Sequence, residues 1–95
     1  MRIFKYPLDI RYDGITAEWE HKSEIALPRG AKILSVGVQG DRGVLWALVD
    51  ESAAKDNRSV QVVNTGGPLS DSFCGRRFIG TLIFGGGGIV LHVFE

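Results

Sequence analysis

Apolar and polar side chains alternate along much of this chain, and the pattern is clearest in residues 32–50, KILSVGVQGDRGVLWALVD. Two apolar runs flank the glycine-bearing segment Gln39–Gly43, a pattern typical of a β-hairpin. We place Val38 opposite Val44, a register that puts six apolar side chains on one face: Leu34, Val36, Val38, Val44, Trp46 and Leu48. The other face is also too apolar to be left to water, so the rest of the fold should pack around this hairpin. It carries Ile33, Ser35, Gly37, Leu45, Ala47 and Val49.

A second hairpin is predicted near the end of the sequence, where residues 76–84 and 89–94 flank four consecutive glycines. Glycine adopts positive φ freely, so Gly85–Gly88 should form the turn. The register that follows pairs Phe84 with Ile89, Ile83 with Val90, Thr81 with His92 and Gly80 with Val93.

Shorter strands are expected at residues 2–6, 25–27 and 59–63. Pro7 cannot donate a hydrogen bond to a sheet, so it should end the first strand or lie at a sheet edge. Residues 15–24 fit either one helical turn or a polar outer strand, and the loops are expected at residues 51–58 and 64–75. We therefore predict one all-β domain over residues 1–95, with six to seven strands and little helix. A compact antiparallel β-sandwich and a partly closed small barrel both satisfy this pattern.

Composition argues against several classes of protein, namely nucleic-acid-binding, disulfide-rich, secreted and membrane proteins. Eleven basic and eleven acidic residues cancel, so no net field favours a nucleic-acid partner. One cysteine excludes an internal disulfide framework and a cysteine-based zinc site. The first residues lack the long apolar run of a signal peptide, and no apolar stretch is long enough to span a membrane. We expect a cytoplasmic protein that needs no cofactor and does not enter a membrane.

Residue types that could support catalysis are few. Cys74 with His92 or His21 is the sole nucleophile–base combination in the sequence, and it lacks an evident third orienting group. His92 alternates with Leu91 and Val93, so it should point outward from its strand, opposite Thr81. Two histidines without a carboxylate at ligand spacing do not predict a metal site. We expect no catalytic residues, no bound metal and no enzyme.

Recognition is expected in two places. Trp19 lies among charged residues, where its ring either covers the rim of the core or serves as an exposed anchor for a partner. The loop over residues 66–77 is long and mixes apolar with polar side chains. Its glycines could hold a phosphate beside one of two adjacent arginines, but turn geometry explains such glycines without a ligand in most cases. The predicted partner-binding residues are Trp19, Gly66, Leu69, Asp71, Phe73, Arg76 and Arg77.

Several segments together resemble a family of small proteins, without an established activity, that are common in bacteriophage and prophage genomes. The resemblance rests on KYPL, LPRGAKILSVGVQ, LWALVD, FIGT and the closing HVFE, which cover most of the chain outside residues 10–24 and the loop after Gly66. The chain departs from the family pattern at Asn64, where a glycine is usual, and has extra residues around Trp19. The resemblance implies a small β domain and a phage context, with no catalytic residues to transfer.

Three functions follow as expectations. The first is a non-enzymatic phage protein in the cytoplasm of a bacterial host, which inhibits an antiviral defence component by protein–protein contact, as anti-CRISPR proteins do. The second is a protein that sequesters a nucleotide signal between subunits. The third is a structural or accessory virion protein whose small residues mark subunit packing, so self-association is left open.

Overall fold

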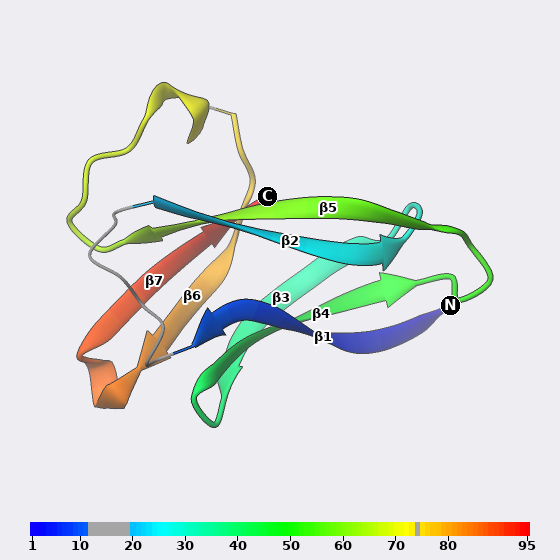
Figure 1. The fold of residues 1–95 in the computed structure, drawn as a ribbon, viewed down its shortest axis with the longest axis horizontal. Helices are drawn as coiled ribbons and strands as arrows, with labels where there is room; N and C mark the ends of the chain where they lie inside the picture. The colour runs from blue at the N-terminus through cyan, green and yellow to red at the C-terminus, as the bar shows by residue number, and fades with distance from the viewer. Residues whose placement is uncertain (12–19, 74) are drawn as a thin grey trace.

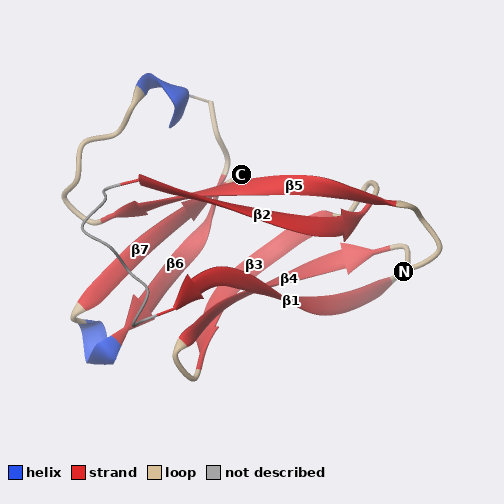
Figure 2. Cartoon of the chain, in the orientation of Figure 1, coloured by secondary structure: helices blue, strands red, loops and turns tan. Residues whose placement is uncertain are grey.

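The computed structural model describes residues 1–11, 20–73 and 75–95, so the predicted sites Trp19 and Cys74 lie outside the described residues. The described chain is almost entirely extended, with short 3-10 turns at Asp71–Phe73 and Gly85–Gly87 (Figure 2). Its strands are β1 (Arg2–Arg11), β2 (Glu20–Pro28), β3 (Lys32–Gln39), β4 (Arg42–Val49), β5 (Lys55–Asn64), β6 (Phe78–Phe84) and β7 (Ile89–Phe94).

The seven strands form two antiparallel sheets that pack face to face (Figure 1). Sheet A has the order β1-β4-β3, and sheet B has the order β2-β5-β7-β6. The edge strands β3 and β6 lie against each other, as do β1 and β2, but neither pair shares a ladder of backbone hydrogen bonds. The protein is therefore a β-sandwich, the first of the two architectures that the sequence allows.

The core lies between the sheets and is filled by alternate residues of each strand. Leu45, Ala47 and Val49 of β4 face Val60 and Val62 of β5, and all five are almost fully buried. Burial of aliphatic side chains on this scale is the main stabilising contribution in a domain of this size. The largest fully buried side chains are Leu8, Leu27, Ile33, Leu45 and Leu82.

The central hairpin, β3–β4, forms as predicted but in a different register. Its turn contains two residues, Gly40 and Asp41, rather than the predicted five, and Val38 therefore pairs with Gly43 instead of Val44. Gly40 has a φ of +64°, the conformation that a tight hairpin turn needs at its first central residue. The ladder is irregular between Ile33 and Ser35, where its register shifts.

This register corrects the predicted faces. Trp46 and Leu48 point away from the core and are only half-buried, and Leu34, at the irregularity, is 39% exposed. Val36 lies inward beside Leu45, where it packs against the core. On β4, the interior is formed instead by the other face of the predicted hairpin, which includes the buried residue Ala47.

The β6–β7 hairpin has the predicted register, with Phe84 opposite Ile89, Ile83 opposite Val90, Thr81 opposite His92 and Gly80 opposite Val93. Gly85, Gly86 and Gly87 all have positive φ, so three consecutive turn residues need a conformation that L side chains rarely adopt. The glycine run is thereby explained by the turn itself.

Other boundaries differ from the predicted ones. Strand β1 continues through Pro7, which pairs with Val44 on the edge of sheet A, so the edge position expected for this proline is confirmed. Strand β2 begins at Glu20, within the segment that the sequence left ambiguous. Strand β5 begins at Lys55, so half of the loop predicted at residues 51–58 belongs to a strand that pairs with β2.

Candidate functional site

The loop between β5 and β6, which the sequence ranked first for recognition, starts with a tight turn. The amide of Gly67 donates to the carbonyl oxygen of Asn64 at 3.3 Å, and Gly66 has a φ of +82°. A turn of this kind favours glycine at its third position. Gly66 therefore shapes the loop, and the geometry of the turn accounts for its presence.

Aromatic rings attach the end of this loop to sheet B. The ring of Phe73 meets the ring of Phe94 edge-on, with centroids 5.4 Å apart, and Phe78 meets the same ring at the same separation. Exposure rises along this row: Phe73 is 7% exposed and Phe78 is 51% exposed. Phe73, predicted to contact a partner, is instead buried and anchors the loop on the sheet.

Arg77 also has a scaffolding role. Its guanidinium donates to the carbonyl oxygen of Ile33 at 3.0 Å and pairs with the carboxylate of Glu95. The same carboxylate accepts a hydrogen bond from Arg58 at 2.5 Å, and Arg58 also donates to the carbonyl oxygen of Ala31 at 2.8 Å. The two arginines thus tie sheet B to the start of β3 across the seam between the sheets.

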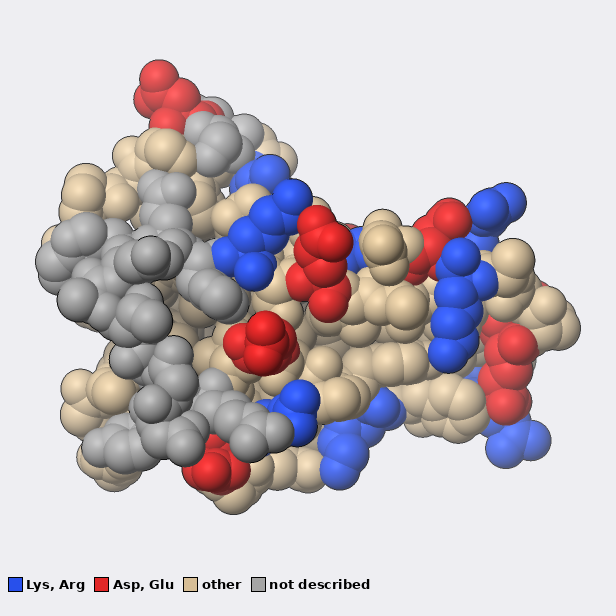
Figure 3. Space-filling view, in the orientation of Figure 1, with Lys and Arg blue, Asp and Glu red and all other residues tan. Residues whose placement is uncertain are grey.

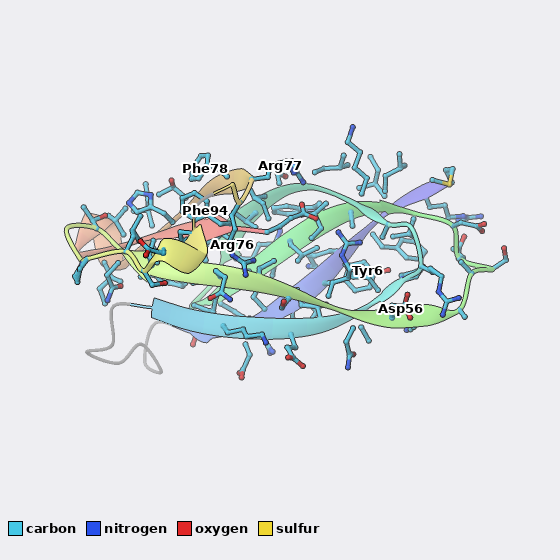
Figure 4. All side chains as sticks on the ribbon, turned by 90° about the horizontal axis from the view of Figure 1, so that it is seen from above. Tyr6, Asp56, Arg76, Arg77, Phe78 and Phe94 are labelled. Atoms are coloured by element: carbon cyan, nitrogen blue, oxygen red, sulfur yellow. The ribbon has the colours of Figure 1, made fainter. Side chains whose placement is uncertain are left out.

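Arg76 and Arg77 lie at different heights in Figure 4, as expected for neighbouring residues of an extended chain. Arg76 is half-buried, and its amide donates to the carbonyl oxygen of Phe73 at 3.2 Å. The structure therefore does not bring the two guanidinium groups together as one anion site.

The exposed candidates that remain are Leu69 and Asp71 in the loop, of which Leu69 is 53% exposed. Next to the loop, sheet B presents what we call the hairpin face, the outward side chains of β6 and β7. Phe78 and Ile83 are its most exposed apolar members, and no side chain on it is charged. The hairpin face consists of Phe78, Thr81, Ile83, Val90, His92 and Phe94.

His92 lies at the centre of this face, outward and opposite Thr81, as predicted. Its Nε2 lies 2.8 Å from the hydroxyl of Thr65 and its Nδ1 lies 3.2 Å from the hydroxyl of Thr81. The Thr65 hydroxyl donates to the carbonyl oxygen of Val90, so its oxygen can accept a hydrogen bond from Nε2–H while the Thr81 hydroxyl donates to Nδ1. Nε2 therefore links the sheet to the start of the loop, and Nδ1 links β7 to β6 within the sheet.

Other kinds of site find little support. Among residues 1–11, 20–73 and 75–95, no group of three histidine, cysteine or acidic residues could hold a metal ion. No helix in the described part of the chain is long and apolar enough to cross a membrane. On the face drawn in Figure 3, positive and negative side chains are interspersed, so that face offers no field of one sign.

Phe78 and Ile83 were absent from the predicted site, although the correctly predicted hairpin register already placed Ile83 opposite Val90 on an outward face. Trp46 was also overlooked as a surface residue, because the predicted register of β3–β4 assigned it to an interior face. The signal for Phe78 was weaker, since a register shift between Phe78 and Gly80 separates it from the regular part of β6.

Comparison with known proteins gives one match. The family model described as a domain of unknown function, DUF7352, matches residues 1–95. Neither the curated proteins nor the solved structures gave a match. Since the family model spans every residue of the sequence, this chain is a member of the DUF7352 family.

Proposed function

We propose that this protein is a non-enzymatic binding protein, encoded by a bacteriophage, that blocks a component of host antiviral defence by protein–protein contact in the bacterial cytoplasm. The observation that carries the proposal is Phe78, a half-exposed aromatic side chain held in place by Phe94. Binding energy at protein interfaces is concentrated in such anchors, particularly where surrounding groups exclude water.

The surroundings of Phe78 suit protein contact. The hairpin face carries no charge that would have to be desolvated, and Ile83 adds a second apolar side chain, 57% exposed, on the same strand. The adjacent loop supplies Leu69 and Asp71 at its exposed part. A rigid sheet that presents apolar anchors beside a polar loop is a common arrangement in binding modules.

The phage setting and the defence target rest on the resemblance of KYPL, LWALVD and HVFE to small phage proteins. Small proteins of that setting commonly act by occupying a host protein. The proposal for the target is thus separate from the proposal for the surface, and the two have different tests.

The surface is tested by affinity capture of the tagged protein from host cells that carry an active defence system. We expect the wild-type protein to retain one host protein in stoichiometric amount and the Phe78→Asp variant to lose it. The matched control is Phe4→Asp, which makes the same aromatic-to-aspartate change on β1 of sheet A, at a residue that is 38% exposed. Loss of the partner in both variants, or in neither, would contradict binding through the hairpin face.

The target is tested by phage plating on hosts with and without the captured defence component. Expression of the wild-type protein should raise plating on the defended host alone, and Phe78→Asp should abolish the gain. An equal plating efficiency with and without the wild-type protein would exclude the role in counter-defence while leaving the capture result in place.

The nucleotide-sequestering alternative has less support, because Arg77 is engaged with Glu95 and Ile33. Calorimetry against a panel of cyclic and ADP-ribose-type nucleotides tests it directly, with Arg76→Ala as the variant. For the virion alternative, mass spectrometry of purified particles is the corresponding measurement.

A further inference from the structure

The outer face of sheet A has a pattern unusual for a solvent-facing sheet. Its central strand, β4, is apolar from Val44 to Val49. In an antiparallel strand with one solvent-exposed face, apolar and polar residues normally alternate. Trp46 and Leu48 are half-buried and lie on the opposite side of β4 from the buried residues Leu45, Ala47 and Val49. A continuous apolar strand of this kind is typical of a sheet covered on both faces.

The neighbours of β4 define a regular surface. On the outer side, Leu48 lies between Ile3 and Lys32, and Trp46 lies between Lys5 and Ser35. We call these six residues the Trp46 face. They share the outward side of sheet A and include the exposed side chains of Ile3, Lys5, Lys32 and Ser35.

Gly37 gives the indole of Trp46 its position. A Cβ atom at residue 37 would lie 3.0 Å from Cζ3 and 3.2 Å from Cη2 of the indole, so the ring lies closely over the glycine backbone. The indole and the glycine backbone therefore form one closely packed platform.

The charged residues in the strands of sheet A are mostly basic. The three strands of sheet A carry five basic residues and a single acidic one, Asp9, whereas the strands of sheet B carry three of each. On the Trp46 face, the ammonium of Lys5 donates to the amide oxygen of Gln39 at 2.7 Å, a neutral partner. Among the described residues, no carboxylate pairs with Lys5 or Lys32.

We propose that the Trp46 face is a second interaction surface, which binds an acidic segment of a partner protein whose apolar side chains pack on Trp46 and Leu48. Carboxylates on such a segment would meet Lys5 and Lys32, on either side of β4. This surface lies on the opposite sheet from the hairpin face, so the proposal stands independently of the one above.

A second copy of the chain fits this face poorly. A two-fold contact places the same patch against itself, so the lysines of one copy would oppose those of the other. Like charges brought together at an interface oppose association, whereas an acidic segment relieves the same repulsion. The sign of the charge therefore selects the partner.

The test is an NMR titration of the whole protein with a synthetic peptide in which glutamate alternates with phenylalanine. We expect resonances of Lys5, Ser35 and the Trp46 indole to shift, and the affinity to fall as salt is added. A peptide with lysine in place of glutamate should produce no such shifts. Oligothymidylate and the protein alone at rising concentration complete the set of probes.

Charge reversal supplies the variant. The double variant Lys5→Glu, Lys32→Glu should lower the affinity for the acidic peptide about tenfold or more, since each change replaces an attraction by a repulsion. Lys55→Glu, on β5 of the other sheet, is the matched control and should leave the affinity unchanged. Both lysines of the double variant are exposed, so its fold should be retained and is checked by the unshifted core resonances.

Each other result overturns the proposal. Binding that is insensitive to the double reversal places the acidic segment elsewhere. If oligothymidylate shifts the same resonances and binds with higher affinity than the peptide, the face is assigned to nucleic acid. Concentration-dependent shifts confined to Trp46 and Leu48 assign it to a second copy, and the absence of any shift with all probes leaves the face without a ligand of this class.

Discussion

Gly80 sets how closely the two sheets approach at the seam between β3 and β6. A Cβ atom at this position would lie 2.9 Å from Cγ2 of Val36, closer than real Cβ atoms pack. We therefore expect Gly80→Ala to lower the free energy of unfolding by about 1–3 kcal/mol, the usual cost of overpacking. Chemical denaturation measures this change in the free energy of unfolding.

Two variants isolate the steric cause in Gly80→Ala. Combining it with Val36→Ala should recover part of the loss, because the clashing methyl is removed. Gly88→Ala adds the same methyl where the nearest atom, the carbonyl oxygen of Gly85, lies 3.6 Å away, and should change stability by under about 0.5 kcal/mol. Equal losses at residues 80 and 88 would contradict packing at the seam as the cause.

Asp50 follows β4 and shows a local effect on ionisation. The hydroxyl of Ser52 donates to its carboxylate at 2.7 Å and the amide of Ser52 donates at 3.0 Å, and these bonds hold the pKa of Asp50 below its ordinary value. The contribution to stability is present above the ordinary pKa and is lost as the pH falls through the lowered one.

Ser52→Ala should raise the pKa of Asp50 toward its ordinary value, because the hydroxyl bond is the larger cause of the shift. The pKa should stay somewhat low, since the amide bond remains. An NMR titration of the Asp50 carboxyl carbon measures the change, and Ser52→Thr, which keeps a hydroxyl, should leave the pKa low. An unchanged pKa in Ser52→Ala would contradict the assignment.

At the scale of elements, the two hairpins show what a pattern of residues can specify. In β6–β7, four glycines between two apolar runs define the turn, and every pair of the predicted register is confirmed. In β3–β4, Gly40 and Gly43 offer two ways to close the turn, and the apolar pattern suits both. A one-residue change in register moves each side chain to the other face, which is how Trp46 was assigned to the wrong side.

The β6–β7 turn permits a prediction about backbone conformation alone. Gly86 has φ 69° and ψ 18°, and no atom lies within 4 Å of a Cβ built on it. Gly86→Ala should cost about 1 kcal/mol of unfolding free energy, the price of a left-handed conformation, with Gly86→Val costing more. Gly86→Asn should cost about half as much or less, because asparagine tolerates this conformation. Thermal denaturation of the three variants gives the order, and equal losses would contradict it.

At the scale of the molecule, the sequence predicts the class of fold better than the surface. Alternation predicts an antiparallel β protein, either a sandwich or a small barrel, because it reports which residues avoid water along each strand. The seams depend on pairs far apart in the sequence, such as Arg77 with Ile33, which no local pattern reveals. For the same reason the sequence pattern predicts Phe73 and Arg77 at the surface, whereas distant residues contact both: Phe94 meets Phe73 and Glu95 pairs with Arg77.

Because Arg77 joins the sheets, its replacement should affect both the stability of the domain and the strands on either side of the seam. Arg77→Met keeps the aliphatic part of the side chain but removes the bonds to Glu95 and to the carbonyl oxygen of Ile33. We expect a loss of about 1 kcal/mol, near the value of one net hydrogen bond because the guanidinium is half-exposed. Amide hydrogen exchange should also accelerate in β3 and β6.

Arg29→Met is the matched control, since it breaks the ion pair with Asp56, in which both side chains are largely exposed. That change should cost under about 0.5 kcal/mol and should leave exchange in β3 and β6 unchanged. If the Arg77 variant behaves like the Arg29 variant, packing alone, through contacts such as that of Gly80 with Val36, closes the seam. If exchange accelerates at the seam while the core of β4 stays protected, the arginine pair with Glu95 is what holds the two sheets together at this edge.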